Sequence, residues 1–208
     1  GYTCIAMHPY YETGWSRNLV YPHIGFDEMH FIDYFDQTKI LREYITDQEL
    51  YDKIIKRYEN RKNNEKLFFM GITMQNHGGY TETYDNFPEN YYKVGRSYTD
   101  ANQYLSLVHE SDEAVKNLIS YFSKVDDPVE IIFFGDHQPS LNSNFYPILN
   151  GKGLTGLTED ELEKLYTVPF FIWTNYDTPE ETVDITSLDY LSTMALERAG
   201  IELPAYNK

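Results

Sequence analysis

Two runs of apolar residues limit what this chain can fold into more than any other feature. One run covers residues 67–74 (LFFMGITM) and the other covers 129–135 (VEIIFFG). Both runs are nearly continuous, which is typical of strands that are buried on both faces. Strands of this kind occur in parallel sheets whose two faces are covered by helices. The two runs therefore predict an α/β fold with a mostly parallel sheet sandwiched by helices.

Segments with helical periodicity separate the predicted strands. Residues 46–49 (TDQE) form a capping box before apolar positions at helical spacing, which predicts a helix at about 47–62. Apolar residues repeat in the same way from about 100 to 124, and a third helix is expected from Ser187 until Gly200 stops it. The chain has 208 residues, a length that suits one domain, so we expect residues 1–208 to form a single domain.

Further strands and loops complete the pattern. Residues 3–8 and 168–173 read as short strands, and a capping box at Thr158 opens a short helix. We expect irregular structure from Pro9 to about Asp36 and a turn-rich segment at about 76–97. Long irregular segments inside a compact domain usually carry function.

Charge and composition exclude several classes of protein. The formal net charge is −16, which argues against a nucleic-acid partner and against unaided adsorption to anionic lipid. A single cysteine, Cys4, rules out an internal disulfide. The 20 tyrosines and 12 phenylalanines suit a groove for a polar, sugar-like or glycerol-like ligand, although a tyrosine-rich surface more often reflects composition bias alone.

Polar side chains follow three of the predicted strands. His8, His77 and the pair Asp136-His137 each lie at or just beyond a strand end. Because parallel strands present their carboxyl ends at one edge of a sheet, we expect these groups to share a site. A carboxylate oxygen and an imidazole nitrogen are competent ligands for Zn²⁺ or Mn²⁺. The alternative is a turn carboxylate beside a surface histidine.

Several of these segments together resemble one known family. Residues 132–139 (IFFGDHQP) look like the late metal-binding strand end of the alkaline-phosphatase superfamily, and of lipoteichoic acid synthases in particular. The elements that family shows before and after this strand also have counterparts, which are His8, Trp15-Ser16-Arg17, Gly25-Phe26-Asp27, residues 73–77 (TMQNH), 168–172 (VPFFI) and 187–193 (SLDYLST).

The resemblance implies a set of site residues. Asp136 and His137 would bind a divalent cation, expected to be Mn²⁺, with Mg²⁺, Zn²⁺ and Ca²⁺ as alternatives. The pocket for a glycerol-phosphate head group would be lined by His8, Trp15, Arg17 and His77. Arg17 can pair with two phosphate oxygens, and either histidine could donate to phosphate or protonate a leaving alkoxide. The alternative for these residues is ordinary packing, which is also what we expect of the remaining histidines, His23, His30 and His109.

The resemblance also implies what precedes these residues in the family. A Thr or Ser nucleophile and an acidic metal ligand belong to an earlier part of the catalytic domain, and neither has a motif match here. We therefore expect an alkaline-phosphatase-like fold that is incomplete at the N-terminus, and a fragment that is inactive alone. It would be the C-terminal portion of a sulfatase-type catalytic domain.

The implied function is a phosphoglycerol transferase. It would move glycerol phosphate from phosphatidylglycerol to a cell-envelope polymer at the extracellular face of a bacterial membrane. Membrane attachment would come from segments outside this chain. Two alternatives stay open. One is a sulfatase or phosphoethanolamine transferase of the same superfamily, and the other is a non-catalytic extracellular binding domain.

Overall fold

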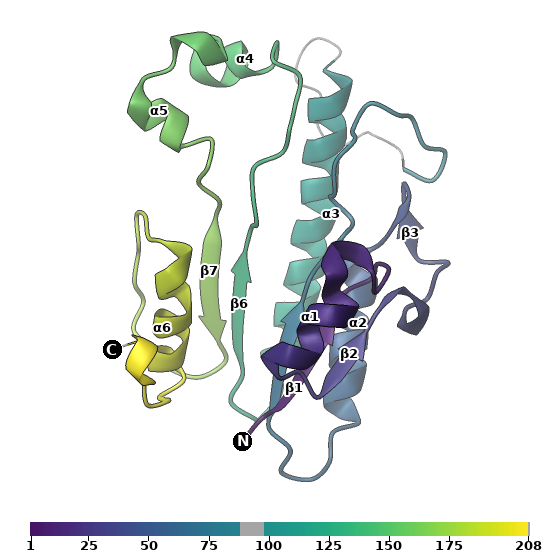
Figure 1. Ribbon diagram of the computed structural model, residues 1–208, viewed down its shortest axis with the longest axis vertical. Helices are drawn as coiled ribbons and strands as arrows, with labels where there is room; N and C mark the ends of the chain where they lie inside the picture. The colour runs from purple at the N-terminus through teal and green to yellow at the C-terminus, as the bar shows by residue number, and fades with distance from the viewer. Residues whose placement is uncertain (88–97, 208) are drawn as a thin grey trace. The chain divides into compact units, whose positions relative to one another are not determined.

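A computed structural model describes residues 1–87 and 98–207 (Figure 1). The chain forms two compact units. The first contains residues 1–118 and 139–157, and the second contains residues 119–138 and 158–208. In the described part of the chain, no helix combines the length and apolar character needed to span a bilayer.

The first unit is built on a three-stranded parallel sheet. Strand β1 (Thr3–Met7) lies in the centre, between β2 (Glu28–His30) and β5 (Leu67–Gly71). Ile5 of β1 is paired with Phe69 on one side and Glu28 on the other. The strands predicted at 3–8 and 67–74 are thus confirmed. Because β1 and β5 are parallel, the segments that follow them leave the sheet at the same edge.

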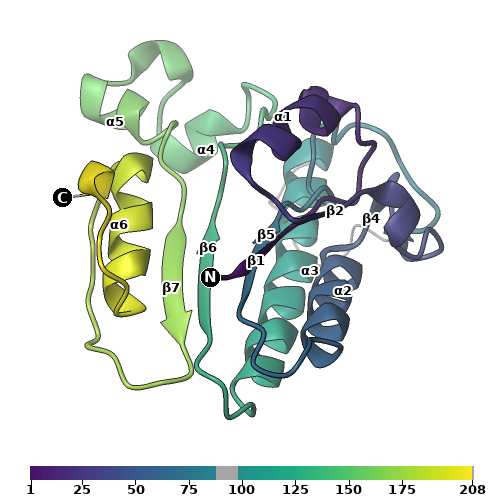
Figure 2. The same ribbon diagram turned by 60° about the horizontal axis from the view of Figure 1, so that its bottom comes forward.

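Two long helices accompany this sheet, and both were expected from the sequence. Helix α2 (Asp47–Glu59) packs on β5, where a Cβ at Gly71 would lie 3.2 Å from the Ile54 Cδ1 atom. Helix α3 (Thr99–Phe122) runs beside α2 (Figure 2), and Asn117 donates a hydrogen bond of 2.8 Å to Gln48. The α/β class with a parallel sheet and flanking helices is therefore confirmed.

The segment predicted to be irregular between residues 9 and 36 contains regular structure instead. It forms a 3₁₀ turn (Gly14–Ser16), helix α1 (Arg17–Ile24), strand β2 and a second 3₁₀ turn (Ile32–Tyr34). Helix α1 buries only Tyr21 and contains Pro22, so it has no apolar stripe that a periodicity search would detect. Strand β2 has three residues, too few to show alternation.

A short hairpin follows in the first unit. Strands β3 (Ile40–Leu41) and β4 (Tyr44–Ile45) pair antiparallel around a two-residue loop whose first residue is Arg42. Arg42 has a φ of 55°, a left-handed conformation that glycine or asparagine usually supplies in such loops. Residues 139–157 also belong to this unit, and they contain helix α4 (Tyr146–Asn150) and a 3₁₀ turn (Leu154–Gly156).

The second unit has an antiparallel strand pair. Strand β6 (Glu130–Phe134) pairs with β7 (Phe170–Thr174), and the rings of Phe133 and Phe171 stack with centroids 5.3 Å apart. The antiparallel direction could not be predicted from the alternation of strands and helices. The remaining elements of this unit are α5 (Glu159–Glu163), α6 (Leu188–Arg198) and a 3₁₀ turn (Ala205–Asn207).

The prediction that both apolar strands are buried on two faces is wrong. In β5, Phe68 is 49% exposed and Met70 is 38% exposed, and Phe134 at the end of β6 is 45% exposed. Side chains alternate along a strand, so Phe69 shares the α2 face with Gly71, while Phe68 and Met70 lie on the other face. A continuous apolar run does not report which face a helix covers.

Candidate active site

His8 follows the last residue of β1 and is 1% exposed. Its Nδ1 lies 3.0 Å from the carbonyl oxygen of Ile72, the residue after β5. A carbonyl can only accept, so Nδ1 carries the proton and donates it. The other ring nitrogen, Nε2, is buried and has no hydrogen-bond partner among the described residues.

Burial also sets the charge of His8. It lowers the pKa to about 4, helped by the positive charge of Arg17, while the bond to Ile72 raises it. The ring is therefore neutral at pH 7, and its Nε2 presents an unshared electron pair. An unpaired buried nitrogen of this kind is rare, and it calls for a hydrogen-bond donor that the described residues do not supply.

Trp15 contacts the ring of His8 edge-on, and Arg17 lies over Trp15. The Trp15 ring centroid is 5.8 Å from that of His8, and the Arg17 guanidinium carbon is 4.4 Å from the Trp15 centroid. Arg17 donates from Nε to the Tyr21 hydroxyl at 2.8 Å and from Nη1 to the Gly14 carbonyl at 3.3 Å. In the part of the chain that is described, Nη2 has no hydrogen bond, so it can bind an anion.

Two consecutive non-glycine residues here adopt the left-handed conformation. Trp15 has φ 53° and ψ 25°, and Ser16 has φ 56° and ψ 30°. Each such residue costs roughly 1–2 kcal/mol relative to the right-handed form. Strain of this kind is found most often at functional sites, because the surrounding structure has to enforce it.

His77 completes the cluster from the other strand end. It is exposed, its ring centroid lies 6.2 Å from that of Trp15, and its Nδ1 is 3.3 Å from the Tyr44 hydroxyl. The structure thus brings together all four residues predicted to line the pocket. We call His8, Trp15, Arg17 and His77 the strand-end cluster.

Arg42 holds the turn that carries His77, and sequence reasoning missed it. Its guanidinium donates to the carbonyl oxygens of Gln75, His77 and Gly79 at 2.8–2.9 Å and to the side-chain oxygen of Gln103 at 3.1 Å. Arg42 is 4% exposed. It therefore binds three alternate carbonyls of one turn from the inside. No sequence motif marks this residue.

A buried polar layer lies beneath the same turn. Gln75 accepts from the Asp47 backbone N–H at 3.1 Å and donates to the Ser111 hydroxyl at 3.2 Å. Ser111 donates to the Asp47 carboxylate. Burial raises the pKa of Asp47 to about 6, against the lowering effect of its bonds to Ser111 and Gln75. The polar layer fixes α2, α3 and the His77 turn to one another.

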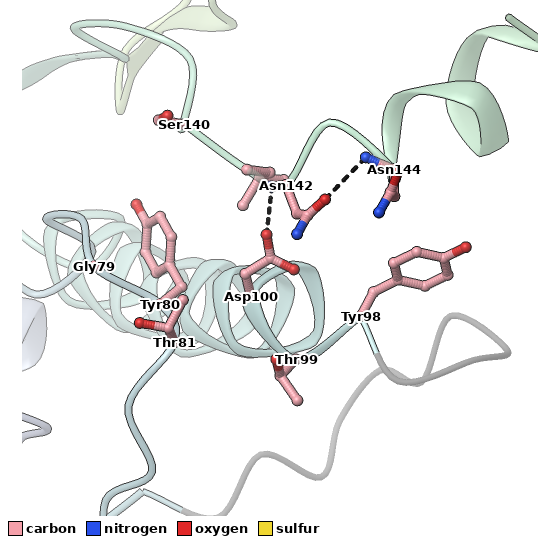
Figure 3. Close-up of a pocket in the computed structure, with 10 residues that line it drawn as sticks. Gly79, Tyr80, Thr81, Tyr98, Thr99, Asp100, Ser140, Asn142 and Asn144 are labelled. Atoms are coloured by element: carbon pink, nitrogen blue, oxygen red, sulfur yellow. Dashed lines mark hydrogen bonds between the residues drawn. The ribbon is translucent and has the colours of Figure 1, made fainter. Parts of the chain in front are cut away.

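A polar pocket lies next to the His77 turn in the first unit (Figure 3). It encloses about 420 Å³, and its lining residues are Gly79, Tyr80, Thr81, Tyr98, Thr99, Asp100, Ser140, Leu141, Asn142 and Asn144. Tyr80 belongs to both features, because its hydroxyl donates to the Asn76 carbonyl at 2.7 Å.

Asp136 and His137 follow β6 in the second unit. Their side chains are 87% and 75% exposed, and Asp136 Oδ2 lies 3.4 Å from His137 Nε2. His137 Nδ1 is 2.9 Å from the Gln138 carbonyl, so Nδ1 carries the proton, and Nε2, the atom beside Asp136, can act as a metal ligand. The two donor atoms face each other, as a shared cation requires.

This pair supplies only part of a metal site. Across residues 1–87 and 98–207, no three His, Cys, Asp or Glu side chains are grouped so that they could hold a metal ion. A carboxylate and an imidazole on adjacent residues fit a divalent cation as two of its ligands. The donor chemistry is thus consistent with a metal that also requires further ligands.

The remaining histidines outside the strand-end cluster were expected to have ordinary packing roles, and His30 shows its surroundings most clearly. His30 stacks on Tyr34 with centroids 4.0 Å apart, and its Nε2 lies 3.2 Å from Glu28 Oε2. Glu28 is itself bound by Arg57 at 2.8 Å. These contacts give His30 a packing environment.

The fold and the cluster define an α/β protein with cationic and aromatic side chains at the carboxyl edge of a parallel sheet. A model of the sulfatase family matches residues 1–201, and the chain belongs to this family. The alkaline-phosphatase-like fold expected from the resemblance is thereby confirmed.

Individual proteins show the same relationship. A putative cyclic beta-1,2-glucan modification protein from Rhizobium meliloti is 28% identical over 99% of this chain and 33% of its own length. The lipoteichoic acid synthase of Staphylococcus saprophyticus is 30% identical over 66% of this chain and 21% of its own. The chain thus spans about a third or less of these relatives, and its likeness to lipoteichoic acid synthases is confirmed.

A solved structure has the same fold. The Streptococcus pyogenes phosphoglycerol transferase GacH, in complex with sn-glycerol-1-phosphate, superposes with a TM-score of 0.78 at 22% identity. The match covers 100% of this chain and 52% of GacH.

Proposed function

We propose that this chain is the C-terminal portion of a single catalytic domain in a metal-dependent phosphoglycerol transferase. The parent protein would transfer glycerol phosphate from phosphatidylglycerol to a cell-envelope polymer at the extracellular face of a bacterial membrane. Support comes from the sulfatase-family match and from the phosphoglycerol transferase and lipoteichoic acid synthase among its relatives.

The observation that carries the proposal is the strand-end cluster. Arg17 stacks on Trp15 and keeps Nη2 for a ligand, which suits an anionic phosphate oxygen. The exposed imidazole of His77 is placed to donate to a second oxygen or to protonate a leaving alkoxide. Trp15, which is 60% exposed, would supply an apolar surface beside the bound head group.

We assign His8 a role different from the one expected. A phosphate oxygen accepts hydrogen bonds, and so does the neutral Nε2 of His8, so these two atoms do not form a good pair at pH 7. A glycerol hydroxyl is a donor and satisfies Nε2. We therefore assign His8 to the glycerol hydroxyl and Arg17 with His77 to the phosphate.

The metal ligands from this chain would be Asp136 and His137, and Mn²⁺ is the proposed ion. When bound, such a cation stabilises the charge that develops on the phosphoryl oxygens. The remaining ligands and the Thr or Ser nucleophile would come from other parts of the parent protein. Residues 1–208 alone should accordingly be inactive.

The test is turnover of fluorescent phosphatidylglycerol by an ectodomain of the parent protein that extends beyond residue 1. The reaction is run with and without Mn²⁺, beside an aryl sulfate substrate and the variants Asp136→Ala and Arg17→Lys. We expect metal-dependent release of diacylglycerol that is lost in Asp136→Ala and reduced at least tenfold in Arg17→Lys.

The other outcomes each point elsewhere. Cleavage of the aryl sulfate without lipid turnover would identify a sulfatase. In a parallel assay with phosphatidylethanolamine, release of diacylglycerol would identify a phosphoethanolamine transferase. A folded, metal-loaded protein that is silent on all substrates would support the non-catalytic binding domain. Phosphodiester hydrolysis by residues 1–208 alone would contradict the expected inactivity of the fragment.

A further inference from the structure

The chemistry of the polar pocket points to an uncharged ligand rich in hydroxyl groups. Its lining contains hydroxyl groups from serine, threonine and tyrosine and amide groups from two asparagines, which donate and accept hydrogen bonds equally well. None of the ten lining residues is Lys, Arg or His. Among these ten described residues, an anionic chain such as a polymer of glycerol phosphate would find no positive partner.

The one charged side chain in the lining already has partners. Asp100, in the first turn of α3, accepts hydrogen bonds from the backbone N–H of Ala101 and from that of Asn142, the second of which is drawn in Figure 3. The Asn144 N–H in turn donates to the Asn142 side chain at 3.0 Å. These bonds shape the pocket wall, and the negative charge of Asp100 further disfavours a phosphate-bearing ligand.

The rigid side of the pocket is Tyr80. It is 6% exposed and packs in a buried cluster with Phe87 and Leu107. The Thr81 side chain beside it is exposed. The pocket therefore has one fixed wall and several free polar groups for a ligand.

The pocket begins at Gly79, two residues after His77 of the strand-end cluster. Arg42 binds the carbonyls of both His77 and Gly79, so the turn and the pocket edge are held by one guanidinium. Three residue steps separate His77 from Tyr80, which places their Cα atoms at most about 11 Å apart. A sugar in the pocket can therefore extend a hydroxyl toward the cluster.

We propose that this pocket is the acceptor subsite, and that it binds a neutral sugar unit of the polymer that receives the phosphoglycerol group. The inference rests on the proposed function and refines it, since it makes the acceptor a carbohydrate rather than a glycerol-phosphate chain. The volume of about 420 Å³ lies in the range of small-molecule sites. One relative is named for modification of a cyclic glucan, which is a neutral sugar polymer.

The transfer that this arrangement serves conserves all atoms. An oxygen of the sugar hydroxyl forms a bond to phosphorus, and the bond from phosphorus to the oxygen of the leaving group breaks. The proton released by the sugar hydroxyl balances the proton taken up by the departing alkoxide. No oxidant or reductant is involved.

Two variants remove pocket groups that make no side-chain hydrogen bond within the described chain, Thr81→Val and Asn144→Ala. Matched controls at exposed positions outside the pocket are Thr182→Val and Asn63→Ala. The probe is a β-1,2-linked glucose disaccharide, with glycerol phosphate oligomer as a competitor. Binding to the parent ectodomain is followed by saturation-transfer NMR, and hydrolysis and transfer of fluorescent phosphatidylglycerol are measured separately.

We expect the double variant Thr81→Val, Asn144→Ala to raise the KM for the disaccharide about tenfold, as the loss of two hydrogen bonds predicts. Donor hydrolysis without sugar should stay unchanged, and the controls should match wild type. Equal loss of hydrolysis and transfer, an unchanged acceptor KM, or displacement of the sugar by the oligomer would overturn the assignment. The wild-type ectodomain could also bind the sugar but show no lipid turnover. If the double variant then lost sugar binding, the pocket would be a sugar site and the proposed transferase function would be refuted.

Discussion

His8 links the geometry of the cluster to a measurable pH dependence. Its pKa in the folded state, about 4, is lower than the ordinary value of 6.5. Between these values the unfolded chain binds more protons than the folded protein does. The contribution of His8 to stability is therefore fully present above pH 6.5 and is lost as the pH falls toward 4.

The variant His8→Gln should remove this loss. We expect the free energy of unfolding of the parent ectodomain to fall between pH 7 and pH 4.5 by up to about 3 kcal/mol more in wild type than in the variant. Urea unfolding at pH 7, 5.5 and 4.5 measures the difference. Parallel pH profiles for the two proteins would show that His8 titrates normally.

Asp47 supplies a control of opposite sign. Burial raises its pKa from 3.8 to about 6, so the folded protein binds the extra proton in this range. Its contribution to stability falls as the pH rises from 3.8 to 6. The stability of Asp47→Asn, measured relative to wild type, should therefore be greater at pH 7 than at pH 4. The stability of His8→Gln relative to wild type should instead be greater at the lower pH.

Arg42 should position His77 for turnover. Arg42→Lys keeps a positive charge but cannot reproduce a planar group that binds three carbonyls and Gln103. We expect kcat/KM for phosphatidylglycerol to fall at least tenfold, and the NMR signals of the His77 imidazole to shift. The double variant with His77→Ala should lose little more than His77→Ala alone, because the two residues act together.

The matched control is Arg57→Lys. Arg57 joins Glu28 and Glu65 at 2.8 and 2.9 Å, so it is also a bridging arginine, but within the described residues it has no hydrogen bond or ion pair to the His77 turn. This variant should lower the unfolding midpoint and leave kcat/KM and the His77 signals in place. If both variants lowered kcat/KM equally, Arg42 would have a general stabilising role only.

At the scale of elements, two helix caps of the same chemistry allow a direct comparison. Thr46 accepts from the Glu49 N–H at the start of α2, and Thr158 accepts from the Glu161 N–H at the start of α5. Helix α2 has 13 residues with a buried face, whereas α5 has five residues and none buried. The two caps should therefore differ in their effect on global stability.

We expect Thr46→Ala to reduce the free energy of unfolding by about 1 kcal/mol. Thr158→Ala should leave it nearly unchanged and increase amide hydrogen exchange only in α5, because a short exposed helix opens locally. Denaturant unfolding with residue-resolved exchange separates these effects. A larger global loss from Thr158→Ala than from Thr46→Ala would show that α5 is part of a cooperative core.

The elements with a strong local signal were predictable. Strand β5 and helices α2 and α3 follow from apolar runs, periodicity and a capping box. Helix α1 and strand β2 did not, since α1 buries only Tyr21 and contains Pro22. Their formation depends on contacts made with β1 and the cluster, and a local pattern does not contain those contacts.

At the scale of the whole molecule, metal binding should couple to stability. If Asp136 and His137 hold Mn²⁺ in the parent ectodomain, an ion at 100 times its Kd stabilises the folded state by about 2.7 kcal/mol. We expect Mn²⁺ to raise the melting temperature and EDTA to reverse the rise. Asp136→Ala should abolish the effect, while Asp126→Ala, at an exposed carboxylate before β6, should retain it.

A result against this expectation is easily recognised. With a net charge of −16, the chain can attract divalent cations without a specific site. A melting shift of the same size in Asp136→Ala and wild type would indicate such general screening. Repeating the titration with added NaCl distinguishes the two, because salt weakens only the nonspecific attraction strongly.

The sequence by itself determined the α/β class, the main strands and helices, and the positions of the candidate site residues, because these depend on local periodicity and short motifs. Only the tertiary structure decided that His8, Trp15, Arg17 and His77 meet, that His8 presents an acceptor nitrogen, and that Arg42 holds the His77 turn. His8 lies 64 positions from Ile72, and Arg42 lies 35 from His77. Contacts over such separations arise from the pairing of β1 with β5 and from the β3–β4 hairpin, and no local pattern encodes them.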